Sequence, residues 1–528
     1  MKLIVAFFLI LLPLLATAQP VNEELSRSLL FNGEPYIAIN PTNPNNLAVA
    51  WMSVSVPSLT IAILTRSSSD GGTTWSDPVQ LPHQDTRYTS ADVSMAWRND
   101  GVLFLSYIDY LDNHDSSSGA VYVVSSTNGG LTWSNPIKAI DANENTDLPI
   151  DRPWIIVDNS NKASAGNLYI TTKPAPWNPL PNHTYFTRSI DSGKTWSTAA
   201  ILDTTGFSAL ALKAPMSTPA VTTDGTLDIV FPYIGNVNGG FALAKSTNGG
   251  GSFARSAVLL PKFAGDTLYK NGYRLIADPS DAQHLVLMWP DVRDGDNDIY
   301  YAVSFEGGTS WSVPVRVNDD APGTGVVQDM LWPTFGKEGT LAVVWRDRRD
   351  GTGTGYTAST NTYYAYSTNG GQSFSKNFRM SDSTAPHEAA LDQPGNDFMS
   401  AVLDKDTLYA VWADTRTTRV QVYFGKVVLG QKSWVSEQSL SEPATTLTIA
   451  PNPTAKGSET LHFVLPQASH CRVVLYNSIG AMVRELAASD YAAGEQTLSF
   501  STTGLAAGEY VVRVETGERV QSAKLLVR

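Results

Sequence analysis

The stretch Ser68-Ser69-Asp70-Gly71-Gly72-Thr73-Thr74-Trp75 decides the fold, because its pattern returns five more times along the chain. The pattern is serine, any residue, an acid or amide, any residue, glycine, any residue, serine or threonine, and an aromatic residue. The further copies begin at Ser126, Ser189, Ser246, Ser304 and Ser367. Copies about 60 residues apart predict a repeat architecture in which each repeat is one supersecondary unit.

Each residue type in this pattern suits a tight hairpin. The Asp or Asn side chain can turn back onto backbone amides, and the glycine permits a left-handed backbone. The Ser or Thr hydroxyl can close a local hydrogen bond, while the aromatic residue packs between neighbouring sheets. The pattern closely resembles the Asp box, or BNR repeat, of sialidases and many other propellers. That resemblance implies a turn between the third and fourth strands of a blade, with a role in folding and none in catalysis.

The segments between the copies have the composition of strands. Three apolar runs precede or lead into the first copy, at 34–39, 47–51 and 59–64, and similar sets recur along the chain. A seventh set within 398–424 has no copy of the pattern after it. We therefore predict an all-β propeller at 19–440, with seven blades favoured and six, the number in sialidases, as the alternative. Either the stretch after Gln19 or residues near Trp434 would complete the last blade.

The N-terminal residues 1–18 predict a signal peptide. A lysine and a short apolar run are followed by Ala16-Thr17-Ala18, a small-x-small cleavage pattern that places the mature start at Gln19. The alternative, a membrane anchor, is disfavoured because the apolar stretch is too short to cross a bilayer comfortably. No later run approaches that length, so no membrane span is expected after cleavage.

Beyond about residue 443 the composition changes, and the repeated pattern and tryptophan stop. Pro451-Asn452-Pro453, Gly508-Glu509-Tyr510 and Lys524-Leu525-Leu526-Val527 follow in order. These motifs resemble a type A sorting domain of the type IX (Por) secretion system. The resemblance implies a small β-sandwich at 443–528, recognition by the type IX machinery, and a secreted or cell-surface protein. The alternative is a small adhesive β-sandwich.

Charge and composition exclude several classes of function. The net charge of −13 disfavours sequence-independent binding to a nucleic acid. The single cysteine, Cys471, excludes an intramolecular disulfide. Asp294-Gly295-Asp296-Asn297-Asp298 begins like a calcium loop but lacks the following glycine and the distal glutamate, and the histidines lack metal-ligand spacing. We therefore expect neither a metal ion nor another cofactor.

A second pattern, Trp-x-Asp-x-Arg, follows the second strand in three of the repeats. Its Asp and Arg residues are Asp291 with Arg293, Asp347 with Arg349, and Asp414 with Arg416. As substrate-binding residues, these arginines would form a ring that holds a carboxylate, because guanidinium offers two donors in one plane. As structural residues, the Asp–Arg pairs would tie each blade to its neighbour, which fits their repetition. The sequence leaves both interpretations open.

The resemblance to sialidases implies three arginines for the substrate carboxylate, a tyrosine nucleophile with a glutamate partner, and an aspartate acid/base. Where that family has an arginine on the first inner strand, this chain offers Glu34. Asp151-Arg152 and Tyr273-Arg274 lie at the start of two other inner strands. Glu34, Asp151, Arg152, Tyr273 and Arg274 are therefore the candidate catalytic residues. The predicted function is a secreted exo-α-sialidase or related glycoside hydrolase acting at the channel mouth. The alternative is a non-catalytic propeller that binds a glycan or another extracellular polymer.

Overall fold

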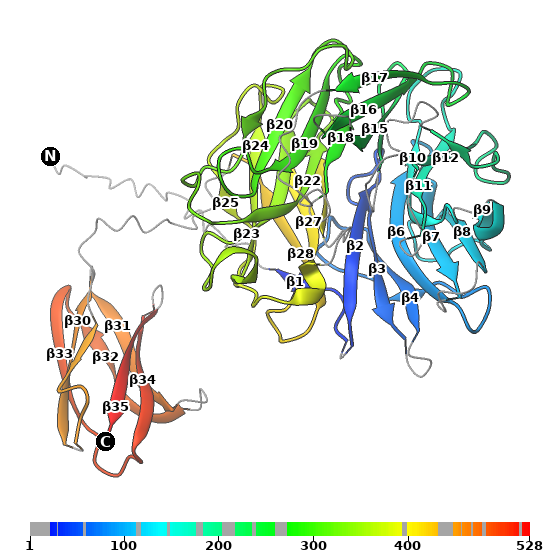
Figure 1. Cartoon of the computed structure of the whole chain (residues 1–528). Coiled ribbons are helices and arrows are strands. Elements are labelled where there is room, and N and C mark those ends of the chain that lie inside the picture. The colour runs from blue at the N-terminus through cyan, green and yellow to red at the C-terminus, as the bar shows by residue number, and fades with distance from the viewer. Residues whose placement is uncertain are drawn as a thin grey trace, which may run out of the picture. The chain divides into compact units, whose positions relative to one another are not determined.

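The chain forms two compact units, Met1–Val435 and Ser436–Arg528, which are described separately (Figure 1). The computed structural model describes residues 22–28, 30–55, 60–111, 118–144, 148–175, 183–202, 217–234, 239–258, 272–392, 399–430, 447–455, 457–465, 468–477, 482–516 and 520–528. The predicted signal peptide 1–18, the start at Gln19, Trp434 and the predicted domain boundary at 440–443 lie outside these residues.

In the described part of the first unit, the strands form seven four-stranded antiparallel sheets. The first three sheets are β2 (Asn32–Ile39), β3 (Leu47–Val54), β4 (Ile61–Ser68), β5 (Val79–Gln80); β6 (Thr89–Trp97), β7 (Leu103–Tyr110), β8 (Gly119–Ser126), β9 (Ile137–Asp141); and β10 (Asp151–Val157), β11 (Leu168–Lys173), β12 (Tyr185–Ser189), β13 (Ala200–Ile201). The next two are β14 (Thr218–Val221), β15 (Leu227–Ile234), β16 (Gly239–Ser246), β17 (Ala254–Val258); and β18 (Arg274–Ala277), β19 (Leu285–Asp291), β20 (Asp298–Ser304), β21 (Val315–Arg316). The last two are β22 (Gln328–Phe335), β23 (Leu341–Asp347), β24 (Asn361–Ser367), β25 (Phe378–Arg379); and β26 (Met399–Asp404), β27 (Thr407–Asp414), β28 (Gln421–Val428), β1 (Glu23–Glu24). Short 3-10 turns lie at Ala142–Glu144, Gly355–Thr357 and Ala389–Asp392.

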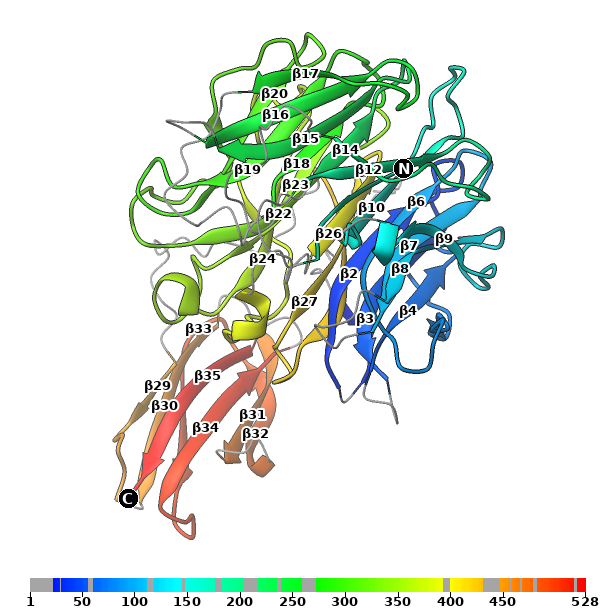
Figure 2. The ribbon, with the colours of Figure 1, turned by 45° about the vertical axis from the view of Figure 1, so that its right-hand side comes forward.

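The seven sheets form a closed ring. The first strand of each sheet contacts the first strand of the next, and β26 contacts β2 (Figure 2). The seventh sheet takes its outer strand from the N-terminal segment, because β1 pairs with β28 through Glu23 opposite Phe424 and Glu24 opposite Tyr423. The all-β fold class predicted from the sequence is confirmed, and β1 is the first of the two expected ways to complete the last sheet.

The second strand of each sheet is covered on both faces. In β3 every residue from Leu47 to Ser53 is buried, because the neighbouring sheets pack against both sides. Four tryptophans on second strands are fully buried in this way: Trp51, Trp289, Trp345 and Trp412. Burial on both faces explains why these strands are continuous apolar runs in the sequence.

The repeated hairpin motif has the contacts that its residue types suggest. In the first copy, the Gly72 amide donates to Ser68 Oγ at 2.9 Å, and the Thr74 amide donates to Asp70 Oδ1 at 2.8 Å. The Trp75 ring lies 5.1 Å from the ring of Phe424 in the preceding sheet of the ring. The motif therefore closes a turn and fills the space between two sheets.

The strand directions give the ring two different faces. Strands one and three of a sheet run the same way, so the turns that follow them lie on one face, here called the turn face. A hydrogen bond of 2.9 Å from the Gly71 amide to the Asn45 carbonyl joins two such turns. The opposite face, here called the loop face, carries the start of each first strand and the end of each second strand.

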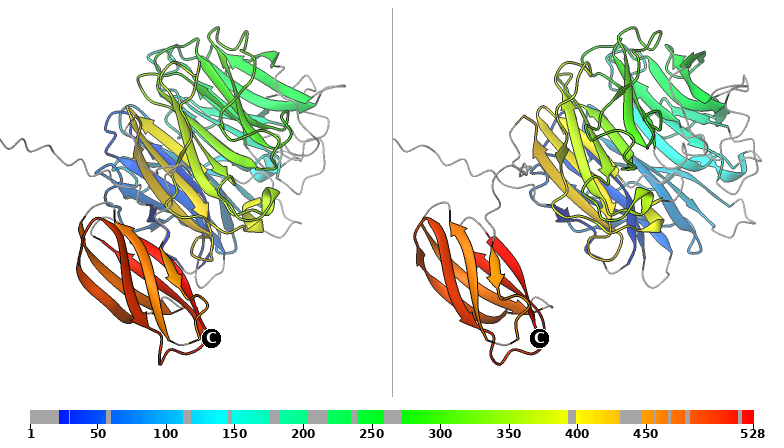
Figure 3. Two further views of the ribbon diagram at one scale, coloured as in Figure 1. Left: turned by 90° about the vertical axis from the view of Figure 1, so that its left-hand side faces the viewer. Right: turned by 60° about the vertical axis from the view of Figure 1, so that its left-hand side comes forward.

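The second unit has two sheets that enclose one core (Figure 3). One contains β29 (Thr448–Ala450), β30 (Ser458–Leu465) and β33 (Gly494–Ser501). The other contains β32 (Met482–Tyr491), β31 (Ser469–Asn477), β34 (Gly508–Glu515) and β35 (Val520–Val527). Leu461 and Phe463 of the first sheet pack with Val473, Val512 and Leu525 of the second. Among the described residues, no helix is long and apolar enough to cross a membrane.

Candidate functional site

Within the described residues, four first strands carry a β-bulge at the same place near their start. The bulges lie between Gly33 and Tyr36, Ala91 and Ser94, Asp151 and Trp154, and Asp329 and Trp332. In each bulge one non-glycine residue has a left-handed backbone: Glu34, Asp92, Arg152 and Met330, with φ between 50° and 55°. Bulges aim side chains in new directions, and such strained residues gather at functional sites. The sequence reasoning found Glu34 and Arg152 but not this shared conformation.

Three of these bulge residues come together on the loop face. Arg152 Nη2 lies 3.7 Å from Glu34 Oε1, and its Nη1 lies 3.9 Å from Asp92 Oδ1. The backbone amide of Arg152 also donates to Asp92 Oδ2 at 3.2 Å. Asp151, the neighbour of Arg152, forms an ion pair with Lys173, which lies opposite it on β11. We call Glu34, Asp92, Asp151, Arg152 and Lys173 the carboxyl cluster.

The surroundings of Asp151 and Asp92 shift the pKa values of these two carboxyls in opposite directions. Burial raises the pKa of Asp151 to about 6, and the charge of Asp92 adds to this effect, although Lys173 and Arg152 oppose it. Burial also acts against ionisation of Asp92, but the charge of Arg152 and hydrogen bonds with Asp151 and Glu34 lower the pKa of Asp92 below its usual value. The surroundings therefore favour the protonated form of Asp151 over that of Asp92 at mildly acidic pH.

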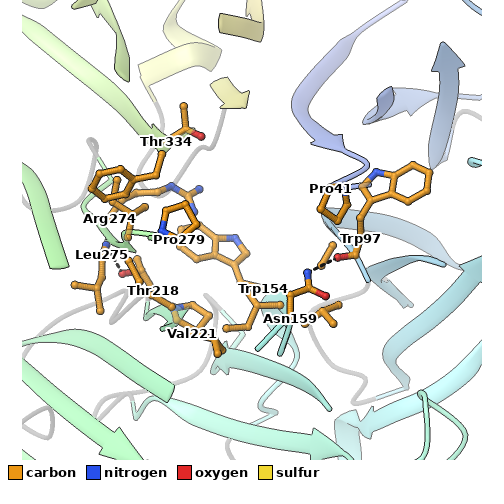
Figure 4. A pocket seen from close by; sticks show the side chains of 18 of the residues that line it. Pro41, Trp97, Trp154, Asn159, Thr218, Val221, Arg274, Leu275, Pro279 and Thr334 are labelled. Atoms are coloured by element: carbon orange, nitrogen blue, oxygen red, sulfur yellow. Dashed lines mark hydrogen bonds between the residues drawn. The ribbon is translucent and has the colours of Figure 1, made fainter. Parts of the chain in front are cut away.

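Arg274 lies apart from the carboxyl cluster in a layer of aromatic rings. Its guanidinium carbon is 3.8 Å from the centre of the Trp154 ring and 3.0 Å from the centre of the Trp332 ring. The Tyr36 ring meets Trp332 edge-on, with centroids 5.3 Å apart. Figure 4 shows Arg274 beside Trp154. Tyr36, Trp154 and Trp332 each follow a bulge residue by two positions, so this aromatic layer lies one step further along the first strands.

Tyr273, one of the five expected catalytic residues, packs inside the ring wall. Its side chain is buried, and its ring lies 4.7 Å from Phe241 of the fourth sheet. Successive strand residues point to opposite faces, so Tyr273 and Arg274 are directed differently. These contacts place Tyr273 in the core between the fourth and fifth sheets.

The three Trp-x-Asp-x-Arg motifs have one common geometry, on loops between second and third strands. In the second copy, Trp345 Nε1 donates to Asp347 Oδ2 at 2.8 Å, and Arg349 Nη2 lies 2.9 Å from the same oxygen. Arg349 also pairs with Asp319, which follows the fifth sheet, at 2.6 Å. The guanidinium of each motif stacks on a tyrosine of the next strand: Arg293 on Tyr300, Arg349 on Tyr363 and Arg416 on Tyr423.

These contacts agree with the structural interpretation, in which the Asp–Arg pairs tie each blade to its neighbour. Arg293 and Arg416 pair with Asp291 and Asp414 of their own motifs, as Arg349 does with Asp347. Arg416 also reaches Asp382 of the sixth sheet's end. Arg349 and Arg416 therefore link one sheet to the sheet before it, and the ring of arginines around one ligand carboxylate expected as the alternative gains no support from this geometry.

The calcium-like segment already uses its carboxylates within the protein. Asp296 accepts hydrogen bonds from the amides of Gly323 and Gly325 at 3.1 and 2.8 Å. Asp298 accepts one from Asn318 Nδ2 at 2.6 Å. In the part of the chain that the structure describes, no group of three or more His, Cys, Asp or Glu side chains could hold a metal ion.

Comparison with known proteins gives a clear result for the second unit. Residues 448–528 match the family described as secretion system C-terminal sorting domain. The C-terminal unit is a sorting domain. It directs the protein through the type IX secretion system to the cell surface or into the medium.

The ring has more distant counterparts. A protein of unknown function from Dyadobacter fermentans is 11% identical to this chain and has a TM-score of 0.43. The match covers 77% of this chain and 99% of the Dyadobacter chain. A Hadza microbial sialidase is 12% identical over 76% of this chain and 66% of its own, with a TM-score of 0.43. An α-L-arabinofuranosidase from Fusarium graminearum is 15% identical over 79% of this chain and 99% of its own, with a TM-score of 0.43. No curated protein sequence matches the chain.

The sorting domain holds the only thiol of the chain. Cys471 is fully buried in the sandwich core, and burial raises the pKa of its thiol. A buried thiol with a raised pKa is a poor nucleophile, so Cys471 acts as a small apolar side chain in the sorting domain.

Proposed function

We propose that the ring is a seven-bladed propeller with glycoside hydrolase activity on glycans outside the cell, and that the carboxyl cluster is its catalytic site. The observation that carries this proposal is the pairing of Asp151, with a pKa of about 6, and Asp92, whose pKa is lowered. Most glycoside hydrolases use one carboxylic acid with a raised pKa and one carboxylate. Export by the sorting domain would bring the site to extracellular polymers.

The roles in this proposal follow from the protonation states. Asp151 donates its proton to the glycosidic oxygen as the bond from that oxygen to the anomeric carbon breaks. A water molecule whose oxygen then bonds to the anomeric carbon returns a proton to the hydrogen-bonded pair of Asp151 and Asp92, which restores the acid. Arg152 is a positioning residue, because its side chain and its backbone amide both hold Asp92. Glu34, hydrogen-bonded to Asp92, has the same role from the first sheet.

A second candidate function, glycan binding without catalysis, is favoured by a separate observation. A sialidase site needs three arginines around one carboxylate and a tyrosine nucleophile. Here Arg349 and Arg416 link sheets, Arg274 stacks between two tryptophans, and Tyr273 lies in the core. The fold already uses these four residues, which favours glycan binding without catalysis over a sialidase site.

The test is turnover of a panel of fluorogenic glycosides, which includes an α-sialoside and an α-L-arabinofuranoside, by the full chain from Gln19 between pH 4 and pH 7.5. We expect Asp151→Asn to lower kcat by about 100-fold or more, since general acid catalysis contributes that much. Asp77→Asn, an exposed Asp on the turn face, is the matched control and should keep full turnover. Absence of turnover by the unaltered protein on every substrate would reject the hydrolase, and binding to a glycan array would then test the second candidate.

A further inference from the structure

A cavity of about 600 Å³ lies inside the ring. Its walls are the later residues of the first strands and the turns that follow them, including Trp97, Asn159, Thr222 and Pro279 (Figure 4). Those turns belong to the turn face. The aromatic layer of Tyr36, Trp154 and Trp332 also lines the cavity, whereas the carboxyl cluster does not. The aromatic layer therefore separates the cavity from the proposed catalytic site.

The charges of this cavity have one sign. Its charged lining residues, among those that the structure describes, are Arg274 and Lys337, and its lining contains no Asp or Glu. The whole chain carries a net charge of −13, so cations here do not follow from the overall composition. A concave site lined by one sign of charge and by apolar walls concentrates ligands of the opposite sign.

The structure holds the Arg274 side chain in a fixed place. Its guanidinium lies between the rings of Trp154 and Trp332, and the residue is only 9% exposed. The strand that carries it is fixed to the fourth sheet, because the Leu275 amide donates to Thr218 Oγ1 at 2.8 Å. A planar cation held in advance loses little freedom when it binds a carboxylate.

Lys337 lies at the rim of the same cavity and is exposed. Its ammonium donates to the Pro41 carbonyl, which belongs to a turn of the first sheet. An ammonium has three donors, so this contact leaves capacity for a ligand. The two cations come from the fifth and sixth sheets.

We propose that this cavity binds a small organic molecule that carries a carboxylate. Arg274 and Lys337 neutralise the carboxylate, and the apolar and aromatic walls, including Trp97, pack against the rest of the molecule. The volume lies within the usual range of about 300–1,000 Å³ for small-molecule sites. An acidic sugar and a non-sugar acid share this chemistry. The inference goes beyond the proposed hydrolase and does not rest on it, because the two sites use different residues on different sides of the aromatic layer.

The test is isothermal titration calorimetry on the full chain from Gln19 with galacturonate, N-acetylneuraminate, benzoate and the neutral sugar galactose. Ligand entry beside Trp154 and Trp332 should also change the tryptophan fluorescence. We expect at least one acid to bind and galactose to bind at least tenfold more weakly. Lys337→Gln should weaken the binding of that acid about fivefold, and Arg274→Lys about tenfold or more, because the lysine loses the planar pair of donors. Lys376→Gln, at an exposed lysine two residues after the sixth hairpin motif and outside the cavity lining, is the matched control.

The acid that binds identifies the chemical class of the ligand. Binding of galacturonate or N-acetylneuraminate indicates an acidic sugar, whereas binding of benzoate alone indicates a non-sugar acid. Lys337 is exposed, so its variant decides the question even where Arg274→Lys fails to fold. The inference is overturned if no acid binds at millimolar concentration, if galactose binds as well as galacturonate, or if Lys337→Gln and the control bind the acid equally. Loss of glycoside turnover in Asp151→Asn without loss of acid binding would show that the two sites are independent.

Discussion

Gly72 of the first sheet lies directly against the ring of Phe424 of the seventh sheet. A Cβ atom on Gly72 would come 2.4 Å from Cζ of that ring, and the glycine has a φ of +78°. The equivalent glycines Gly250 and Gly308 approach Phe186 and Leu243 of their preceding sheets, where a Cβ would come within 2.6 and 2.5 Å. The glycine of the hairpin motif is therefore required for its backbone conformation and for the close approach of two sheets.

This relationship predicts a strong effect of Gly72→Ala. The left-handed backbone costs a non-glycine residue roughly 1–2 kcal/mol, and overpacking against Phe424 adds about 1–3 kcal/mol. We expect the free energy of unfolding, measured in urea, to fall by about 2–5 kcal/mol. Gly101→Ala is the matched control, because Gly101 has a φ of +90° but no atom within 4 Å of the added Cβ. Equal losses in the two variants would show that the contact with Phe424 is unimportant.

The carboxyl cluster predicts the pH dependence of turnover. Asp151 must be protonated to act as an acid, so kcat/KM should fall as pH rises through about 6. Because the charge of Lys173 lowers the pKa of Asp151, Lys173→Met should move this limb of the profile to higher pH. A profile measured with the best fluorogenic substrate checks both statements, and an unchanged limb in Lys173→Met would contradict the assignment of the acid to Asp151.

The contacts of Arg349 predict that Arg349→Ala lowers the stability of the protein but leaves its turnover unchanged. Asp347 is fully buried, and Arg349→Ala would leave its carboxylate without its cation. Removal of one partner of a buried pair typically costs about 3–5 kcal/mol, and the partial exposure of Arg349 favours the lower figure. We expect a lower melting temperature in calorimetry, with turnover or acid binding unchanged well below that temperature. The opposite result, lost turnover with unchanged melting, would restore Arg349 as a substrate-binding residue.

The sorting domain predicts the fate of a shortened chain. Removal of residues 448–528 should leave a folded ring in the periplasm, because the ring has its own cores and the export signal is gone. Cell fractionation with a ring-specific antibody measures the distribution, and circular dichroism of the periplasmic protein checks its fold. Normal amounts of the shortened protein in the medium would mean that export uses another signal.

The repeated hairpin motif made the fold accessible from the sequence, because each residue type serves the same local contact in every sheet. The Trp-x-Asp-x-Arg motifs were found in the same way, but their contacts with Asp319 and Asp382, which favour the structural interpretation, are visible only in the structure. Tyr273 and Arg274 were both catalytic candidates because they stand at the start of an inner strand, although adjacent strand residues point to opposite faces.

For a different reason, the sequence predicted only Glu34, Asp151 and Arg152 of the carboxyl cluster. Asp92 and Lys173 were missed because they come from different strands and belong to no motif. Alignment of the repeats could have found them: Asp92 occupies the bulge position of Glu34 and Arg152, and Lys173 stands near the end of a second strand, where Asp347 and Asp414 stand in later sheets. The bulges themselves depend on pairing between strands, which a linear pattern does not display.

Because strand β1 has only two residues, the resistance of the ring to force should depend on which end of the chain is pulled. Tension from the C-terminal side reaches the ring through the end of β28, and peeling this strand away must break its ladders to both β27 and β1. Arg416 adds a hydrogen bond of 3.1 Å to Asn22, just before β1. Pulling on the N-terminal side loads the bonds of Asn22 and the short pairing of Glu23 and Glu24, which form no long strand ladder, so the ring should open from that end at the lower force.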